Sequence, residues 1–166
     1  MRHTHTPWIA ALLAALAVAG CKPGGSKGAC GSGETANADP AFCYKLPAGF
    51  AARGEPVARK GWFNIAYSGD DKASVNFIAL GPDGFDARWK ELQGNSKSAK
   101  ATDAKEEEFA GGKGKILTYT TPEKEPRFIV SAVYRGAKSV LGCEAEYRVS
   151  APKPALVDAC KSIHEP

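Results

Sequence analysis

FIVSAVYRGAKSVLGCEAEYRV, residues 128–149, is the stretch of the chain that decides its fold class. In its second half, apolar and charged side chains alternate. The apolar positions are Leu141, Cys143, Ala145, Tyr147 and Val149, and the charged positions between them are Glu144, Glu146 and Arg148. Such alternation is typical of a strand with one face on the core, and it points Cys143 inward. The four residues 135–138 separate this strand from a second one at 128–134. A connection this short predicts an antiparallel hairpin.

Further strand-like segments lie before this hairpin, each bounded by turn-forming residues. They are residues 42–46, then 62–68 and 74–80 around a Gly-Asp-Asp-Lys turn, then 106–110 and 115–121 around the glycine-rich turn 111–114. The last two pairs are predicted hairpins, like residues 128–149. Most neighbouring strands are therefore expected to be antiparallel.

Two segments have helical rather than alternating periodicity. Phe85, Trp89 and Leu92 are spaced for one face of a helix over residues 85–93, with Asp83 as its N-cap. In the last segment, entered through Pro152 and Pro154, the inward positions are Leu156, Ala159, Cys160 and Ile163. The order of segments predicts an α+β fold, with a mostly antiparallel sheet of about six or seven strands flanked by two or more helices. We expect a single globular domain over residues 40–166.

The first twenty residues have the parts of a secretory signal peptide. Arg2 and the α-amino group supply positive charge, and an apolar run from residue 8 to residue 20 follows and ends in small residues. As a helix this run would rise about 20 Å, which is short of the ~30 Å hydrocarbon core of a bilayer. Residues 1–20 therefore predict an export signal rather than a membrane span.

The sequence Val18-Ala19-Gly20-Cys21 resembles the lipobox of bacterial lipoproteins. The resemblance implies cleavage before Cys21, a diacylglycerol thioether on its sulfur, and a fatty acid such as palmitate on the new amine. Two or three acyl chains give durable membrane attachment. Lys22 stands where inner-membrane lipoproteins typically carry Asp, so the resemblance further implies the outer membrane, facing the periplasm. An ordinary secretory signal, a Gram-positive host and surface export stay open as alternatives.

Residues 22–39 (KPGGSKGACGSGETANAD) have the composition of a flexible linker, so residues 21–39 are predicted to form a lipidated tether. Its typical reach would be roughly 23 Å. With Cys21 assigned to lipid, an even number of cysteines remains, which is typical of disulfides in an oxidising compartment.

Three disulfide pairings are possible. Cys143 and Cys160 both face the core, on a strand and on the helix that follows it, which favours a bond between them. Cys30 and Cys43 are then left to pair. Cys43 lies on the strand face opposite Phe42, so we expect it to point outward and to hold part of the tether against the domain.

The residues offer little for catalysis or metal binding. After the signal peptide the one histidine is His164, close to the C-terminus, where we expect a solvent-exposed tail. There is no C-x-x-C pair, no nucleophile elbow, no phosphate-loop pattern and no calcium-loop spacing. Glu106, Glu107 and Glu108 should alternate between strand faces, and Asp70 and Asp71 occupy a turn. The sequence therefore predicts no catalytic residue, no metal site and no cofactor.

The segment FCYKLPAGF, residues 42–50, resembles the opening strand and turn of PsbP-like domains. The central helix after a hairpin, the later meander and the closing strand and helix resemble the same family. The resemblance spans most of residues 40–165 and implies an antiparallel sheet flanked by helices. Members of this fold differ in activity, so the resemblance implies no particular function.

The composition limits the classes of molecule that the chain is expected to bind. The net charge of +4 is small and spread along the chain, which argues against a nucleic-acid partner. Trp62 lies opposite Phe63, Ile65 and Tyr67 on its strand, so it is the candidate for an exposed aromatic residue at a binding surface. We expect a non-enzymatic, lipid-anchored periplasmic domain that binds a protein or supports envelope assembly. The alternative is a domain that binds a small ligand or an envelope polymer.

Overall fold

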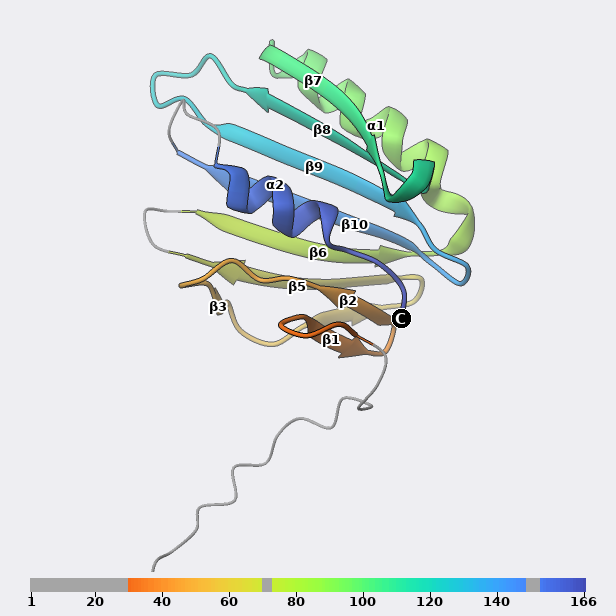
Figure 1. Ribbon diagram of the computed structural model, residues 1–166. Coiled ribbons are helices and arrows are strands. Elements are labelled where there is room, and N and C mark those ends of the chain that lie inside the picture. Colours follow the sequence, from red (N-terminus) through yellow and green to blue (C-terminus); the bar gives the residue numbers. More distant parts are fainter. Residues whose placement is uncertain (1–29, 70–72, 149–152) are drawn as a thin grey trace, which may run out of the picture.

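An eight-stranded antiparallel sheet forms the centre of the computed structural model, which describes residues 30–69, 73–148 and 153–166 (Figure 1). The strand order is β3-β5-β6-β10-β9-β8-β7, with β4 also paired to β5. The strands are β3 (Ala51–Ala52), β4 (Val57–Arg59), β5 (Trp62–Ser68), β6 (Ser74–Leu80), β7 (Thr102–Phe109), β8 (Gly114–Thr120), β9 (Phe128–Arg135) and β10 (Val140–Tyr147). The predicted α+β class and antiparallel sheet are confirmed. The predicted strand number was too low because β3 and β4 are too short to show alternation.

The three predicted hairpins are present, and the pairings of β10 with β6 and of β8 with β9 join them into one sheet. β7 begins four residues earlier than predicted, at Thr102. Its first residues include a register shift between Thr102 and Lys105, and Asp103 has a positive φ of 53°. This irregular, exposed start has no apolar alternation, so periodicity could not find it.

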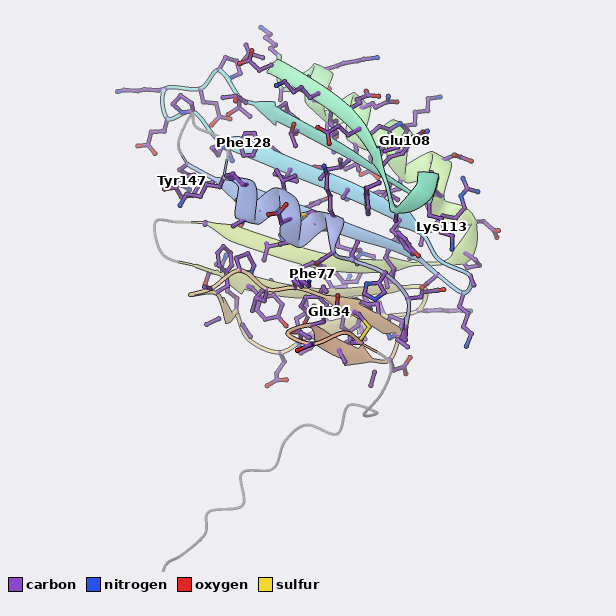
Figure 2. The ribbon with its side chains drawn as sticks, in the orientation of Figure 1. Glu34, Phe77, Glu108, Lys113, Phe128 and Tyr147 are labelled. Carbon is purple, nitrogen blue, oxygen red and sulfur yellow. A yellow bond between two sulfur atoms is a disulfide. The ribbon has the colours of Figure 1, made fainter. Side chains whose placement is uncertain are left out.

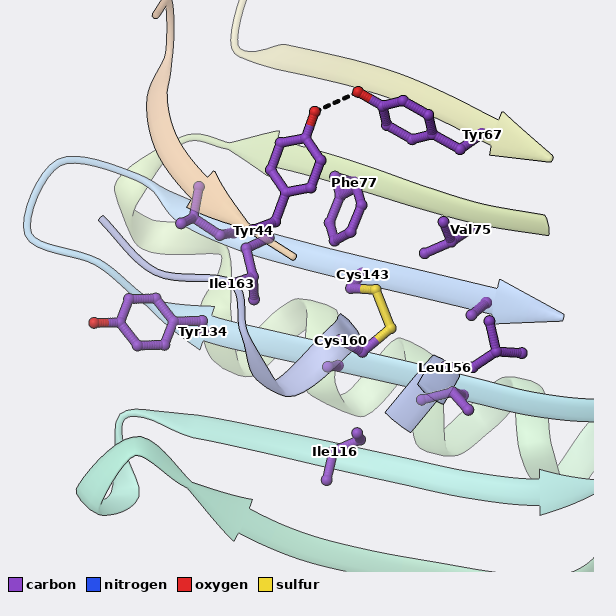
Figure 3. Close-up of a cluster of buried hydrophobic side chains, with 14 of the residues drawn as sticks. Tyr44, Tyr67, Val75, Phe77, Ile116, Tyr134, Cys143, Leu156, Cys160 and Ile163 are labelled. Atoms are coloured by element: carbon purple, nitrogen blue, oxygen red, sulfur yellow. Dashed lines mark hydrogen bonds between the residues drawn. A yellow bond between two sulfur atoms is a disulfide. The ribbon is translucent and has the colours of Figure 1, made fainter. Parts of the chain in front are cut away.

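One face of the sheet is covered by α2 (Pro154–Lys161) and by a two-stranded hairpin of β1 (Thr35–Ala38) and β2 (Ala41–Tyr44) (Figure 1). Figure 3 shows its core, in which Tyr44 and Tyr67 share a hydrogen bond between their hydroxyls above Phe77. The ring centroids of Tyr44 and Phe77 lie 4.0 Å apart. The predicted inward positions of the last segment, Leu156, Ala159, Cys160 and Ile163, are all buried here.

The other face carries α1 (Phe85–Ser98), which packs Phe85, Trp89 and Leu92 on β8 and β9. The helix is five residues longer than predicted, because Ser96 continues its buried face where the apolar residues have ended. Asp83 is not the N-cap, which was a wrong prediction. It lies in a short 3₁₀ turn, Pro82–Gly84, and Gly84 occupies the cap position without a side-chain hydrogen bond.

The N-terminal boundary of the fold differs from the expected one. The tether was predicted to run to Asp39, but Thr35–Ala38 form β1 and pair residue by residue with β2. Cys43 lies opposite Phe42 and Tyr44 and is bonded to Cys30, as expected, but it is fully buried rather than exposed. Its side of β2 is covered by the disulfide to Cys30 and by a bridge between the backbones of Cys43 and His164. Residues 1–29, with Cys21 and the predicted signal peptide, lie outside the described residues.

The two helices leave different parts of the sheet uncovered. On the α1 side, the helix lies over β8 and β9, while β5, β6 and the end of β10 have no helix above them among the described residues (Figure 1). Toward the β5–β6 turn, the side chains that alternation directs to this uncovered area are polar or small, namely Asn64, Ala66, Ser68, Ser74 and Asn76. Toward the other end of the two strands the same face carries the larger apolar side chains of Trp62, Ile78 and Leu80. An antiparallel sheet tolerates one wetted face, and here half of a face is left open.

Candidate functional site

Two disulfides connect the elements as the sequence predicted. Cys143 of β10 is bonded to Cys160 of α2, and Cys30 is bonded to Cys43 of β2, with Cα–Cα distances of 5.2 and 5.6 Å. The first bond ties the helix to the centre of the sheet (Figure 3). The second ties the first described residue to the hairpin. Both have structural roles, so neither marks a reactive thiol.

The surroundings of Cys30 are the one grouping of metal-ligating side chains among the described residues, and they do not form a metal site. Cys30, Glu34 and Cys43 offer ligand atoms within 4.8 Å of one another, but the two sulfurs are bonded to each other. Disulfide sulfurs lack the thiolate charge that metal ions require. Glu34 instead faces His164, with 3.7 Å between Oε2 and Nε2, and Figure 2 shows Glu34 at the hairpin.

The C-terminus is fixed rather than frayed, so the expectation of an exposed tail at His164 was wrong. The His164 N–H donates to the carbonyl of Cys43, and its Nδ1 lies 2.9 Å from the carbonyl oxygen of Ser162. The Glu165 carboxylate accepts backbone N–H groups of the β9–β10 turn, at 2.9 Å from Lys138 and 3.1 Å from Ser139. Desolvation raises the pKa of Glu165, but these hydrogen bonds outweigh it and hold the pKa below its ordinary value.

The acidic run alternates between faces as predicted. Glu106 accepts a hydrogen bond from Gln93 of α1 at 2.8 Å, whereas Glu107 pairs with Lys161 of α2 at 2.6 Å. The Lys161 ammonium, through its hydrogen bond and charge, holds the pKa of Glu107 below its ordinary value. These contacts connect the edge strand β7 to both helices, which is a structural role. Asp70 and Asp71 lie outside the described residues.

Trp62 is half-buried, less exposed than the sequence suggested. It lines a groove of about 360 Å³ at the end of the sheet, where the β1–β2 turn approaches the β4–β5 turn and the β9–β10 turn. A second hollow of about 490 Å³ adjoins it and reaches Glu165 and Pro166. The two share Asp39, Pro40, Lys138 and Ser139 in their walls.

A groove beside α2 has a different character. Its volume is about 350 Å³, and it lies between the helix and β7 on the α2 side of the sheet. Ile116, Phe128 and Val157 form an apolar floor, while charged side chains of β7, among them Lys105 and Glu107, form one wall. Ile116 and Phe128 are buried, so little apolar surface is offered to a ligand.

The uncovered half of the α1-side face contains a polar cavity of about 230 Å³. It lies where the second half of α1 stands above the sheet. Its lining comes from α1 and from four strands, namely Leu92, Asn95, Ser74, Asn76, Tyr119, Ile129, Ser131, Glu144, Ala145 and Glu146. Most of these groups are amides, hydroxyls or carboxylates. The cavity is therefore built to exchange hydrogen bonds rather than to bury apolar surface.

The charges at this cavity are compensated. Glu144 is paired with Arg88 of α1, and Glu146 lies 3.4 Å from Arg127, which also pairs with Glu123. Burial raises the pKa of the Tyr119 hydroxyl, Arg127 opposes the rise and Glu146 adds to it. The phenol therefore stays protonated at neutral pH and can donate a hydrogen bond.

The amides of this face are free. Among the described residues, the side chains of Asn64, Asn76 and Asn95 are hydrogen-bonded to no other protein group. Each keeps two donors and an acceptor for solvent or for a ligand. Sequence reasoning did not select these residues, because an Asn at an outward strand position looks like any solvated side chain. The second half of α1, which brings Asn95 close to Asn76, is what makes a cavity.

Comparisons with known proteins give no family or function to transfer. A scan against models of protein families finds no match, and no curated protein sequence matches the chain. Among the described residues, no helix has the length and apolar content needed to cross a bilayer.

Proposed function

We propose that this protein is a lipid-anchored lipoprotein of the bacterial cell envelope whose folded domain binds a neutral, hydroxyl-rich envelope polymer without catalysis. The anchor is proposed on Cys21, from its resemblance to a lipobox cysteine, and the address is the periplasmic side of the outer membrane. The α+β fold, with helices on both faces of an antiparallel sheet, supports the further proposal of a PsbP-like domain.

The observation that carries the binding proposal is the polar cavity beside α1. Its free amides, Asn76 and Asn95, and the Tyr119 hydroxyl can pair with the hydroxyl and amide groups of a glycan strand. Its carboxylates are already paired with arginines, so the site offers no net charge that would select an ion. A site with several unpaired hydrogen-bonding groups favours a ligand that can satisfy them.

The same ion pairs argue against an enzyme. Glu144 and Glu146 are the two carboxylates that line the cavity, and each accepts hydrogen bonds from a guanidinium. A general acid or base needs a carboxyl that is free to exchange a proton with the substrate. These carboxylates are held by their arginines, which suits a binding surface.

A protein partner is the second candidate, and the groove beside α2 favours it. That groove has the apolar floor of Ile116, Phe128 and Val157 that a protein side chain could enter. However, Val57 is the only large hydrophobic side chain classed as exposed among the described residues. Protein interfaces have a more apolar core than that, so the polymer is the better-supported occupant.

Binding can be tested by co-sedimentation with purified cell-wall glycan. The variant Asn76→Ala/Asn95→Ala removes hydrogen bonds of about 0.5–1.5 kcal/mol each and should weaken binding about tenfold. Asn64→Ala is the matched control, because Asn64 is on the same face but does not line the cavity. Equal binding by all three proteins would contradict the proposed site.

Two further measurements separate the parts of the proposal. Mass spectrometry of the mature N-terminal peptide should show acyl chains on Cys21, and an unmodified peptide would overturn the lipoprotein proposal alone. Cross-linking and pull-down from intact cells tests the partner. Recovery of one stoichiometric protein, lost in Val157→Asp and kept in Asn76→Ala/Asn95→Ala, would favour the groove beside α2 instead.

A further inference from the structure

The tip of the β4–β5 hairpin has the composition of a membrane-interface anchor. Its residues are Val57, Ala58, Arg59, Lys60, Gly61 and Trp62, and we call them the hairpin tip. The Val57 side chain is 47% exposed, which makes it the one large exposed hydrophobic among the described residues. Tryptophan, with an apolar ring and a polar N–H, is enriched where a bilayer meets water.

The two cations of the hairpin tip have no protein partner. Neither Arg59 nor Lys60 is in an ion pair with another described residue, and both are exposed. Most other arginines of the fold are paired, as Arg88, Arg127 and Arg135 are. Asp39 is the one acidic residue in the lining of the groove, and it is also exposed. Free cations beside an exposed valine and a tryptophan fit an anionic lipid surface.

The hairpin tip also lies close to where the chain enters the fold. Cys30 is bonded to Cys43, and the ring of the preceding residue, Phe42, lies 5.7 Å from that of Phe63, next to Trp62. Asp39 and Pro40 of the β1–β2 turn share a groove with Arg59 and Trp62. Cys30, where the described chain begins, is therefore linked to the hairpin tip through a few contacting residues.

The disulfide shortens the distance over which the domain can move. The predicted tether of residues 21–39 is fixed to the fold at Cys30, so only nine Cα–Cα steps separate Cys21 from the domain. Its typical reach falls to roughly 15–18 Å, and full extension gives about 30 Å. That segment adds two more cations, Lys22 and Lys27. An anchor this short keeps the side of the domain near Cys30 at the membrane.

We propose that the hairpin tip docks on the anionic leaflet that holds the lipid anchor, with Val57 and Trp62 in the interface and Arg59 and Lys60 on lipid phosphates. The inference rests on the proposed lipid anchor at Cys21. The polar cavity lies toward the opposite end of the sheet, near the last turns of α1. Docking therefore turns the cavity away from the membrane, toward the aqueous polymer.

Tryptophan fluorescence of the lipidated mature protein tests the docked orientation. Trp89→Phe leaves Trp62 as the only indole after the leader is removed, and Trp62→Phe leaves Trp89, which is buried under α1. In vesicles of phosphatidylethanolamine and phosphatidylglycerol with brominated chains, Trp62 emission should be quenched and Trp89 emission should not. Circular dichroism of both variants checks that they are folded.

Charge variants test the lipid contact. Each cation near an anionic surface favours docking by about fivefold, so Arg59→Gln/Lys60→Gln should weaken the docked state about 25-fold and abolish the quenching. Lys97→Gln/Lys100→Gln removes the same amount of charge near the C-terminal end of α1, far from the hairpin tip, and should leave the quenching unchanged. Unquenched Trp62 in a protein that carries acyl chains overturns the docking while the anchor stands. A mature protein without acyl chains overturns both.

Discussion

The two faces of the sheet are closed by different kinds of contact. On the α2 side the aromatic cluster around Phe77 is buried, and the Cys143–Cys160 disulfide fixes the helix to the sheet. On the α1 side the helix is held by a smaller apolar cluster and by cations above its rings. Lys115 lies 5.7 Å from the Trp89 ring centroid, and Arg135 lies 4.3 Å from that of Phe85.

The difference gives the α2 side a role in stability and, under the proposed function, the α1 side a role in binding. The α2 side covers most of its face with α2 and the β1–β2 hairpin, so its interior side chains are committed to packing. The α1 side leaves half of its face open, and the cavity there is lined mostly by polar side chains, some of them without protein partners among the described residues. Binding sites commonly depend on groups that packing does not consume. Substitutions on one side or the other should therefore have different effects.

The largest effect is expected on the α2 side, from Cys143→Ala/Cys160→Ala. The disulfide closes a loop of 17 residues, so its removal should lower the free energy of unfolding by roughly 3 kcal/mol. Urea unfolding followed by circular dichroism measures the loss. Leu92→Ser, in the apolar cluster under α1, shows for comparison how much stability the α1 side contributes. A double variant that unfolds at the wild-type midpoint would show that the bond does not hold this face.

A smaller effect is expected for Glu165→Gln, which weakens the clamp that follows α2. Its hydrogen bonds from the β9–β10 turn should contribute about 1–2 kcal/mol at neutral pH. Because the folded pKa is lowered, this contribution is complete above the ordinary pKa of glutamate and is lost as the pH falls through the folded pKa. The stability difference between wild type and variant should therefore shrink in acid. A difference that is constant down to the acid transition would contradict this account.

The smallest effect is expected on the α1 side, from Glu144→Gln. The Arg88–Glu144 pair is partly exposed, with 39% of the Glu144 side chain accessible, so its loss should cost under about 1 kcal/mol of stability. Glycan co-sedimentation should respond more than stability does, because Glu144 lines the cavity, whereas Arg88 keeps its ion pair with Glu91 at 2.7 Å. Thermal unfolding and glycan co-sedimentation of the same preparation measure the loss of stability and the loss of binding. Equal binding with a large stability loss would assign the pair to the fold alone.

The sequence predicted best where the pattern was local. Alternation in residues 141–147 and helical spacing from Leu156 to Ile163 each placed one cysteine on the core side, and the Cys143–Cys160 bond follows from the two together. The three hairpins are local as well, because short turns determine which strands pair. These elements make up most of the sheet.

Features that depend on distant contacts escaped prediction. Thr35–Ala38 has a linker composition and becomes a strand only because β2 and the disulfide hold it in register. Cys43 and His164 are covered by each other's backbones, which no pattern around either residue indicates. The polar cavity needs both Asn76 on β6 and Asn95 on α1, and only the packed helix brings them together.

The Cys30–Cys43 bond also determines how the domain resists mechanical force. Tension pulled along the chain before Cys30 would otherwise peel β1 from β2 one residue pair at a time. The bond passes that tension directly to Cys43, whose backbone is joined to His164 by hydrogen bonds of 2.8 and 3.1 Å. Unzipping of the hairpin is thereby bypassed, and the strain is shared with the C-terminal segment that Glu165 secures.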